Sequence, residues 1–234
     1  MNRKKKYLVL DTETCNELSC PLVYDIGFAV CDKDGHIYEQ GSYIIKEVFF
    51  GMTDVMKSAY YASKISSYFV AISTGQINVC GLWDIRRIIH KVCEDWGITE
   101  IRAYNAHFDV NALNNTMRYL TKSKCRYFLP YKMPIGCIWN MACNSLYNRP
   151  TFFKFCLENN FISNRGNLST SAEVGYRYLT QNADFEEKHT GLEDVLIEVQ
   201  IMARCYKTHK KIENAVNRSC WRIPTKAYKE YCAK

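Results

Sequence analysis

Two strand-like runs near the start of the chain are joined by an Asp-Gly turn. Residues 22–32 (LVYDIGFAVCD) and 36–46 (HIYEQGSYIIK) are rich in β-branched and aromatic residues, and Lys33-Asp34-Gly35 lies between them. An Asp-Gly pair in this setting predicts a β-hairpin. A third apolar run, at residues 6–11, precedes the pair. Together the three runs predict an antiparallel meander.

Helical patterns follow the meander. Apolar side chains in residues 82–96 recur at helical spacing, and the pattern stops at Gly97. A short strand is predicted at 100–105, and further helices are predicted at 53–72, 107–120, 137–146, 171–180 and 192–207. A meander followed by strands that alternate with helices predicts an α/β domain with a mixed sheet.

The composition is that of an ordinary globular chain. Its 234 residues are 47% apolar and 24% charged, enough for one well-buried domain. No apolar stretch reaches the roughly 20 residues of a membrane span, and the basic N-terminus has no apolar segment of a signal peptide behind it, so we expect a cytoplasmic protein without membrane contact. The 12 cysteines contain no C-x-x-C pair. We therefore expect reduced core residues, not a zinc site or a disulfide scaffold.

Positive charge is concentrated in two places. Residues 110–157 hold seven Lys or Arg and no acidic residue, and residues 203–234 hold nine Lys or Arg against two Glu. Such patches are typical of proteins that bind phosphate backbones, although solvated surfaces also show them. We divide the chain into a main domain, residues 1–208, and a basic C-terminal tail, residues 209–234.

Two carboxylates end the first strand. In YLVLDTETC (7–15), Asp11 and Glu13 are separated by one residue, so in a strand both side chains point to the same face. Like charges this close repel unless something positive lies between them. A solvated strand end would also carry such a pair, and the pair alone does not decide between the two.

A third carboxylate follows the strand at 100–105. In AYNAHFDVNAL (103–113), Asp109 lies in the first turn of the next helix and away from its apolar stripe. An aspartate there is favoured by the helix dipole. However, ligand sites in open α/β sheets lie beyond the carboxyl ends of strands, and Asp11, Glu13 and Asp109 would all lie at such ends.

The last group opens the long C-terminal helix. In HTGLEDVLIEVQIMARCY (189–206), Thr190 and Glu193 have the spacing of a capping box. His189 and Asp194 then take the two positions that ordinarily touch as an apolar staple. A chance histidine before a capped helix is one explanation; a site that contains both side chains is the other.

Four carboxylates cannot converge without cations, and hard oxygen ligands suit Mg²⁺ or Mn²⁺. Sites of this kind commonly hold two ions, which clamp the attacking and leaving oxygens of phosphoryl transfer. A histidine within reach can take the proton of the attacking water. The set Asp11, Glu13, Asp109, Asp194 and His189 is therefore interpreted as a two-metal site.

The ordered motifs D-x-E, N-x-x-F-D and H-x(4)-D resemble those of the DEDDh 3′–5′ exonucleases, the DnaQ-like branch of the ribonuclease H-like fold. The resemblance covers about residues 6–206. It implies a mixed five-stranded sheet, an antiparallel meander plus parallel strands, flanked by helices. It also implies hydrolysis of phosphodiester bonds at the 3′ end of single-stranded or frayed nucleic acid, DNA favoured, with release of nucleoside 5′-monophosphates.

The same resemblance implies a role for each residue of the set. Asp11 would bridge two divalent cations, Mg²⁺ or Mn²⁺. Glu13 and Asp194 would complete one ion site, Asp109 would support the other, and His189 would be the general base.

Substrate contacts are also implied, with departures from the pattern. Thr14 matches the motif, but Cys15-Asn16-Glu17-Leu18 follows where many members have Thr-Gly-Leu, so Leu18 is the candidate wedge residue. Asn105 and Phe108 match the second motif. Tyr104 stands where relatives often have histidine.

Three alternatives stay open at this point. Recognition of the 2′-OH leaves no trace in the sequence, so an exoribonuclease of the same family is one alternative. A nucleic-acid or polymerase-binding module without catalysis is another. A third concerns the basic tail. If the protein proofreads, it does so as a separate subunit, and the tail would dock on a polymerase or another replication protein; a grip on nucleic acid and a solvated end are equally good interpretations of the tail. The richness in Asn, Lys, Tyr and Ile is typical of AT-rich genomes, such as those of some phages.

Overall fold

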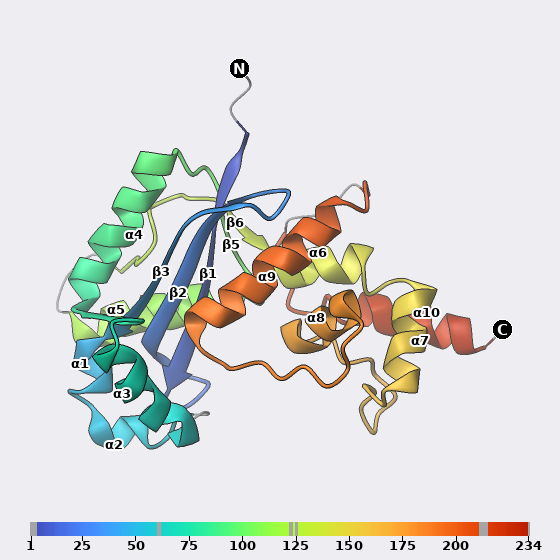
Figure 1. Cartoon of the computed structure of the whole chain (residues 1–234), viewed down its shortest axis with the longest axis horizontal. Helices are drawn as coiled ribbons and strands as arrows, with labels where there is room; N and C mark the ends of the chain where they lie inside the picture. The colour runs from blue at the N-terminus through green and yellow to red at the C-terminus, as the bar shows by residue number, and fades with distance from the viewer. Residues whose placement is uncertain (1–3, 60–61, 122–123, 125, 211–214, 234) are drawn as a thin grey trace.

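A six-stranded mixed sheet in the order β4-β3-β2-β1-β5-β6 forms the centre of the computed structural model, which describes residues 4–59, 62–121, 124, 126–210 and 215–233 (Figure 1). The first three strands pair antiparallel, and β4, β5 and β6 add to the sheet in parallel. The strands are β1 Lys6–Cys15, β2 Leu22–Asp32, β3 Ile37–Ile45, β4 Asn78–Cys80, β5 Ile101–Ala103 and β6 Ile135–Cys137. The prediction of five strands was therefore one short. Neither β4 nor β6 was located from the sequence, because three residues are too few to show alternation.

The predicted hairpin is confirmed. Gly35 has a φ of 87°, a left-handed conformation that glycine adopts without strain. The Asp32 carboxylate accepts hydrogen bonds from the main-chain N–H groups of Asp34 (2.9 Å) and His36 (3.1 Å), which fixes the turn. Every residue of β2 is buried, so this strand is covered on both faces.

Most predicted helices are present. Helix α4, Leu82–Trp96, ends at Gly97 with a φ of 62°, as expected. The others that match the predictions closely are α5 Ala106–Leu120, α6 Ile138–Ser145, α8 Ala172–Thr180 and α9 Gly191–Tyr206.

The predicted helix at 53–72 was wrong. The chain there forms α2, Thr53–Met56, a 3₁₀ turn at Ala62–Lys64 and α3, Ile65–Ser73; residues 60–61 lie outside the described part. Three other helices were not predicted: α1 Lys46–Phe49, α7 Pro150–Glu158 and α10 Arg222–Cys232. Pro150 occupies the first turn of α7, where its missing N–H has no cost.

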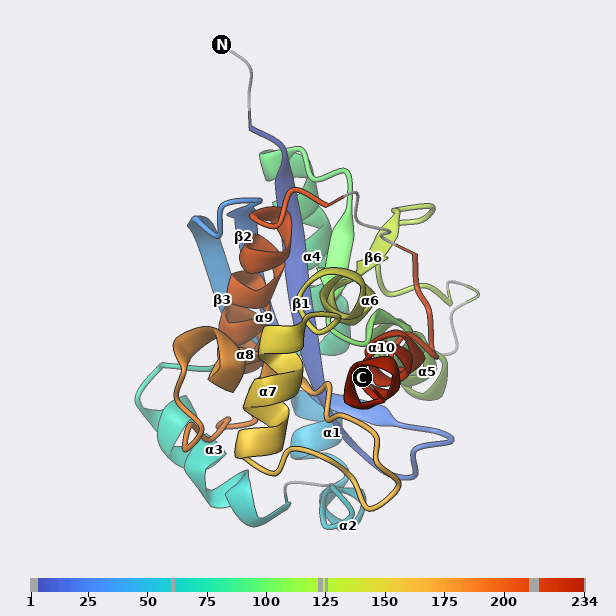
Figure 2. The same cartoon turned by 90° about the vertical axis from the view of Figure 1, so that its right-hand side faces the viewer.

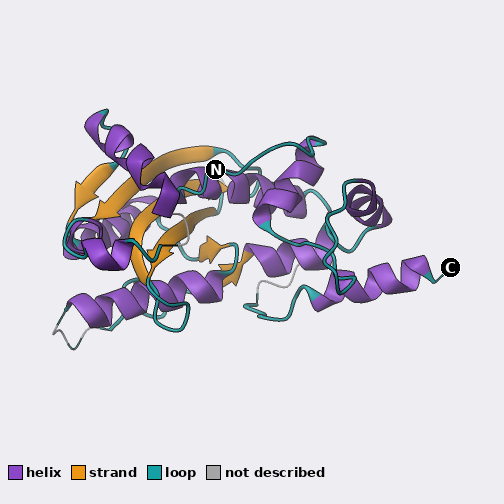
Figure 3. Ribbon diagram, turned by 90° about the horizontal axis from the view of Figure 1, so that it is seen from below, coloured by secondary structure: helices purple, strands orange, loops and turns teal. Residues whose placement is uncertain are grey.

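Helices cover both faces of the sheet (Figures 1 and 3). Successive side chains of β1 point to opposite faces of the sheet. Leu8 and Leu10 belong to the core on the side of α4 and α5, whereas Tyr7 and Val9 belong to the core on the side of α6 and α9. A slip of one residue would exchange the two sets, so burial on both faces fixes the register of β1. The odd-numbered positions, including Asp11 and Glu13, thus face α9.

The first turn of α9 rests directly on the backbone of β2. A Cβ atom on Gly27 would overlap the carbonyl carbon of Gly191, and one on Gly191 would lie 2.6 Å from the main-chain nitrogen of Gly27. Gly27 is the residue of β2 that pairs with Asp11. Glycine inside a strand is typical of such close backbone approaches.

The C-terminal segment is packed on the domain over residues 215–232. Cys220 is fully buried, and the ring of Tyr228 in α10 lies 5.8 Å from that of Phe153 in α7, edge to face. Residues 211–214 and 234 of the predicted tail lie outside the described part, and the boundary at 208 stays a prediction. Within the described residues, no helix is both long and apolar enough to cross a membrane. The 11 cysteines that the structure describes are free thiols, and eight of them are buried.

Candidate active site

Asp11 and Glu13 lie on the face of β1 that α9 covers. Glu13 is 8% exposed, and Asp11 is partly buried. The pairing of β1 with β2 is regular as far as Glu13 and shifts between Glu13 and Thr14, a β-bulge. Bulges of this kind are common beside active sites, because they redirect the end of a strand.

Helix α9 brings His189 and Asp194 to the same place. Ligand atoms of Glu13, His189 and Asp194 all lie within 4.8 Å of one another, a spacing that fits a metal ion. Nδ1 of His189 is 4.0 Å from Oδ2 of Asp194 and 3.7 Å from Oε2 of Glu187. His189 has a φ of 54°, so the chain turns sharply before the helix and directs the imidazole back over its first turn.

The helix start differs from the predicted capping box. The Thr190 hydroxyl donates to the Glu193 carboxylate (3.0 Å) and does not cap a main-chain N–H. The carboxylate of Asp25 in β2 instead accepts from the N–H of Gly191 (2.9 Å). Asp25 is fully buried, and this bond attaches the N-terminus of α9 to the sheet.

Asp109 approaches β1 from the face of the sheet opposite α9. It is 3% exposed in the first turn of α5, and its Oδ1 accepts a 2.9 Å hydrogen bond from the hydroxyl of Thr12. Asp109 and Asp11 are not part of the close trio of Glu13, His189 and Asp194. They interact with it electrostatically through their charges.

A fifth carboxylate, Glu198, was missed. It lies one helical turn after Asp194 on α9 and is 2% exposed. The charge with the largest effect on Asp11 is that of Glu198, which places its carboxylate beside the end of β1. One oxygen of Glu198 and one of Asp194 are buried without a hydrogen-bond partner among the described residues. Buried oxygens in this state are what a bound cation would satisfy.

The carboxylates are held in an environment that favours their protonated forms. Burial, and next the charge of Asp194, raise the pKa of Glu13 to about 9. Burial raises the pKa of Asp194 to about 8 and that of Asp109 to about 7. The pKa of Asp11 is raised well above its ordinary value by burial and then by Glu198. Divalent cations would reverse these shifts, because they favour the charged forms.

The pKa of His189 is lowered, whereas those of the carboxylates are raised. Burial, and after it the ammonium group of Lys64, lower the pKa of His189, so the imidazole is neutral at pH 7 and able to accept a proton.

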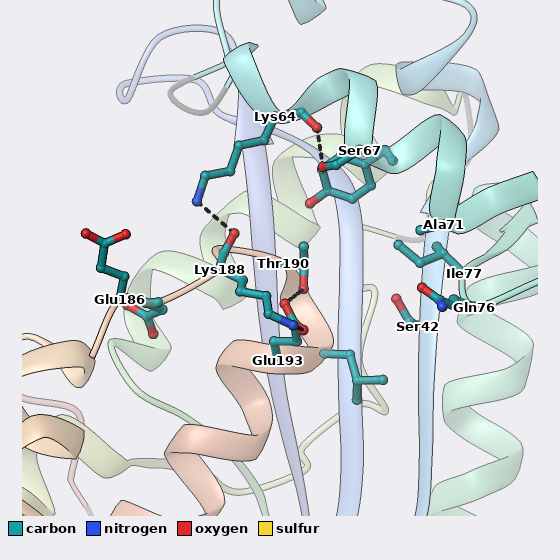
Figure 4. Close-up of a pocket in the computed structure, with 13 residues that line it drawn as sticks. Ser42, Lys64, Ser67, Ala71, Gln76, Ile77, Glu186, Lys188, Thr190 and Glu193 are labelled. Carbon is teal, nitrogen blue, oxygen red and sulfur yellow. Dashed lines mark hydrogen bonds and ion pairs between the residues drawn. The ribbon is translucent and has the colours of Figure 1, made fainter. Parts of the chain in front are cut away.

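Helix α3 supports the segment that carries His189. Lys64 donates to the carbonyl oxygen of Lys188 (2.8 Å), and the hydroxyl of Tyr68 donates to Asp25 (2.8 Å). Between α3 and this segment lies a cavity of about 620 Å³, which Lys64, Lys188 and Glu193 help to line (Figure 4). Lys64 and Tyr68 thus connect this part of the chain to the histidine segment and, through Asp25, to the start of α9.

A second cavity, of about 580 Å³, lies at the start of α5, where Phe108, the residue before Asp109, helps to line it. We call it the α5 groove. The described residues that line it are Leu18, Ser19, Pro21, Asn105, His107, Phe108, Asn111, Asn115, Arg118, Trp139 and Arg218, and none of them is acidic. Three of the four predicted substrate contacts therefore share one surface, and the fourth, Thr14, is not among these lining residues. Leu18 is 84% exposed at the rim.

Tyr104 points away from this surface. It is 9% exposed, and its hydroxyl lies 2.8 Å from that of Tyr147 and donates to the carbonyl of Thr170 (2.6 Å). The residue that replaces the usual histidine is thus part of the core.

No protein-family model and none of the curated protein sequences match the chain. Solved structures do. The zinc-bound complex of E. coli ExoI with ssDNA is 14% identical with a TM-score of 0.52, over 89% of this chain and 41% of that one. The chain shares the ribonuclease H-like fold of exonuclease I.

Two other exonuclease I structures agree with this result. A product-bound form is 15% identical with a TM-score of 0.52, over 88% of this chain and 44% of that one. An ExoI/SSB-Ct complex is 14% identical with a TM-score of 0.51, over 89% and 42%. The present chain spans less than half the length of each neighbour. The predicted fold class is confirmed, with six strands in place of five.

Proposed function

We propose that the protein is a metal-dependent 3′–5′ exonuclease that acts on single-stranded DNA and releases nucleoside 5′-monophosphates. One observation carries the proposal: ligand atoms of Glu13 in β1 and Asp194 in α9 lie within 4.8 Å of a neutral histidine, His189, and the charge of Asp109 in α5 acts on Glu13. The groove at the start of α5 has no acidic residue among its described lining. The fold shared with exonuclease I supports it. The DEDDh assignment of Asp11, Glu13, Asp109, Asp194 and His189 is part of the proposal.

The donor set fits divalent cations. It consists of carboxylate oxygens, the ligands that Mg²⁺ and Mn²⁺ prefer. One oxygen of Asp194 and one of the neighbouring Glu198 are buried without a hydrogen-bond partner among the described residues. Asp11, Glu13, Asp109 and Asp194 would hold two ions. When bound, the ions would activate a water molecule and stabilise the charge that develops on the phosphate.

The chain's own residues have distinct tasks. His189, neutral at pH 7, accepts a proton from the attacking water. Thr12 orients the Asp109 carboxylate through its 2.9 Å hydrogen bond. Leu18, Asn105 and Phe108 line the path of the terminal nucleotides, and Leu18 separates the last base from its neighbour.

The test uses a 5′-labelled single strand, as DNA and as RNA of the same sequence, with Mg²⁺, Mn²⁺ or EDTA. We expect a ladder that shortens from the 3′ end, faster on DNA, and absent in EDTA. Asp11→Asn should abolish it. His189→Ala should reduce the rate by about 10²–10⁴-fold, the usual contribution of a general base.

Matched controls separate chemistry from folding. Asp184→Asn and His209→Ala make the same changes at exposed positions and should leave the rate unchanged. Faster degradation of RNA would favour the exoribonuclease alternative. A protein that binds both strands and cuts neither with any metal would contradict the proposal and favour a binding module.

A further inference from the structure

The C-terminal segment reaches into the α5 groove. Arg218 is one of the residues that line this cavity, and its Nη2 lies 3.2 Å from Nδ1 of His107 in the first turn of α5. His107 is two residues from Asp109. Figure 2 views α10, which follows this segment, end on, with α5 further from the viewer behind it. A residue of the basic tail thus lies close to the carboxylate site.

The turn that carries Arg218 is held at both ends. The side chain of Asn140 in α6 donates to the carbonyl of Ala215 (2.9 Å). On the other side, Cys220 is fully buried and hydrogen-bonds to the thiol of Cys143. The side chain of Asn217 accepts from the N–H of Ser219 (2.9 Å). The backbone position of Arg218 is therefore determined by the core and not by its own exposed side chain.

His107 orients the guanidinium, because Nη2 of Arg218 lies 3.2 Å from Nδ1 of the imidazole, within hydrogen-bonding distance. Its other nitrogen lies 2.7 Å from the side-chain nitrogen of Asn111. The hydrogen bond to His107 uses only one of the five N–H donors of the Arg218 guanidinium. Arg118 lines the same cavity.

We infer that Arg218 binds a backbone phosphate of the single strand whose 3′ end enters the carboxylate site. The planar guanidinium matches a phosphate in charge and in hydrogen-bonding geometry. The groove that it lines has no acidic residue among those described, so no carboxylate there competes for the guanidinium. This inference rests on the proposed function, and it gives the basic tail the role of a substrate contact.

The test measures how the affinity for single strands depends on salt. Labelled oligo-dT and oligo-U are titrated with the full chain carrying Asp11→Asn, in Mg²⁺, at several KCl concentrations. Each phosphate contact to a single strand contributes about 0.7 to the slope of log K against log [salt]. We expect Arg218→Gln to reduce the slope by about 0.7, on both probes if the backbone is the ligand. Arg218→Lys, which keeps the charge, should retain it.

Arg222→Gln is the matched control, because Arg222 is exposed, lies four residues further on and is not among the residues that line the groove. An unchanged slope in the Asp11→Asn protein with Arg218→Gln, while the protein with Asp11 intact shortens single strands, would overturn this inference alone. An equal reduction in Arg222→Gln would overturn it too, because the effect would then come from overall charge. If the unmutated protein neither binds nor degrades single strands, the proposed function itself fails.

Discussion

The ammonium group of Lys64 donates a 2.8 Å hydrogen bond to the main-chain carbonyl of Lys188, the residue immediately before His189. The two lysines are 124 residues apart in the chain. Burial lowers the pKa of His189 most, and the charge of Lys64 has the next largest effect. One side chain therefore influences both the position and the protonation of the proposed general base.

Lys64→Ala should lower kcat and leave KM for a single strand nearly unchanged. A hydrogen bond to a charged group contributes about 1.5–3 kcal/mol, so the expected loss is about 10–100-fold. Without the ammonium group the pKa of His189 rises, and the acidic limb of the kcat–pH profile should move to higher pH. Lys64→Arg should restore both, and Lys57→Ala, at an exposed ion pair, should change neither. A profile that keeps its position in Lys64→Ala would contradict the prediction.

Glu198→Gln should have opposite effects on the metal-free and metal-bound proteins. In EDTA, burial, and next the charge of Asp109, raise the pKa of Glu198 well above its ordinary value, so folding must protonate this carboxyl group. The amide has no such cost, and stability should increase by about 1 kcal/mol, or roughly 2–4 °C in Tm for a chain of this size. The stabilisation by added Mn²⁺ should become smaller, because the cations lose an anionic neighbour. Thermal melts with and without Mn²⁺ measure both effects. Glu158→Gln, on the exposed face of α7, is the control. Equal changes of Tm in the two variants, with and without Mn²⁺, would disprove the role of Glu198.

The stability of the metal-free protein should decrease as pH rises. The folded-state pKa values of Asp109, Asp194 and Glu13 are raised to about 7, 8 and 9, whereas the ordinary values are 3.8 for Asp and 4.5 for Glu. Between these limits the folded state holds protons that the unfolded state has lost, so the free energy of unfolding falls with pH. Melts in EDTA from about pH 4.5 to pH 9 should show a falling Tm, and saturating Mg²⁺ should remove most of the fall at the alkaline end. A Tm that rises across this window in EDTA would refute the assignment.

Gly27→Ala should lower both stability and activity. The added methyl group meets the backbone of Gly191, which cannot move aside as a side chain can. Overpacking of this kind typically costs about 1–3 kcal/mol. Gly41→Ala on β3 is the control, because the atoms nearest to its methyl group would belong to the rings of Phe28 and Tyr43, which are side chains and not backbone. Melting curves and exonuclease rates of the two variants provide the comparison; equal losses would show that the contact with α9 is unimportant.

The parts of the site that sequence could predict are those with local patterns. Asp11 and Glu13 share a face because strands have a period of two, and His189 and Asp194 meet because residues before a helix fold back on its first turn. Glu198 had a local signal as well. It is four residues after Asp194, hence on the same face of the helix, within an otherwise apolar stripe.

Other contacts of the candidate site left weaker patterns in the sequence, or none. Asp25 is a carboxylate inside an apolar strand, which indicates a buried polar contact but does not identify the partner, Gly191. The contact of Lys64 with Lys188 and that of Arg218 with His107 join segments more than 100 residues apart. No periodicity predicts such pairs, because they depend on how α3 and the C-terminal segment pack.

The contact between Gly27 and Gly191 has a consequence for how freely this sequence can change. It brings the first turn of α9, which carries Asp194, into backbone contact with the strand residue that pairs with Asp11, so the spacing of these carboxylates depends on two positions that have no side chain. We expect exchanges among the apolar residues around the contact to change this spacing less than a side chain at either glycine would. Tolerance to sequence drift and constancy of the site are therefore compatible in this fold, provided that two positions never acquire a side chain.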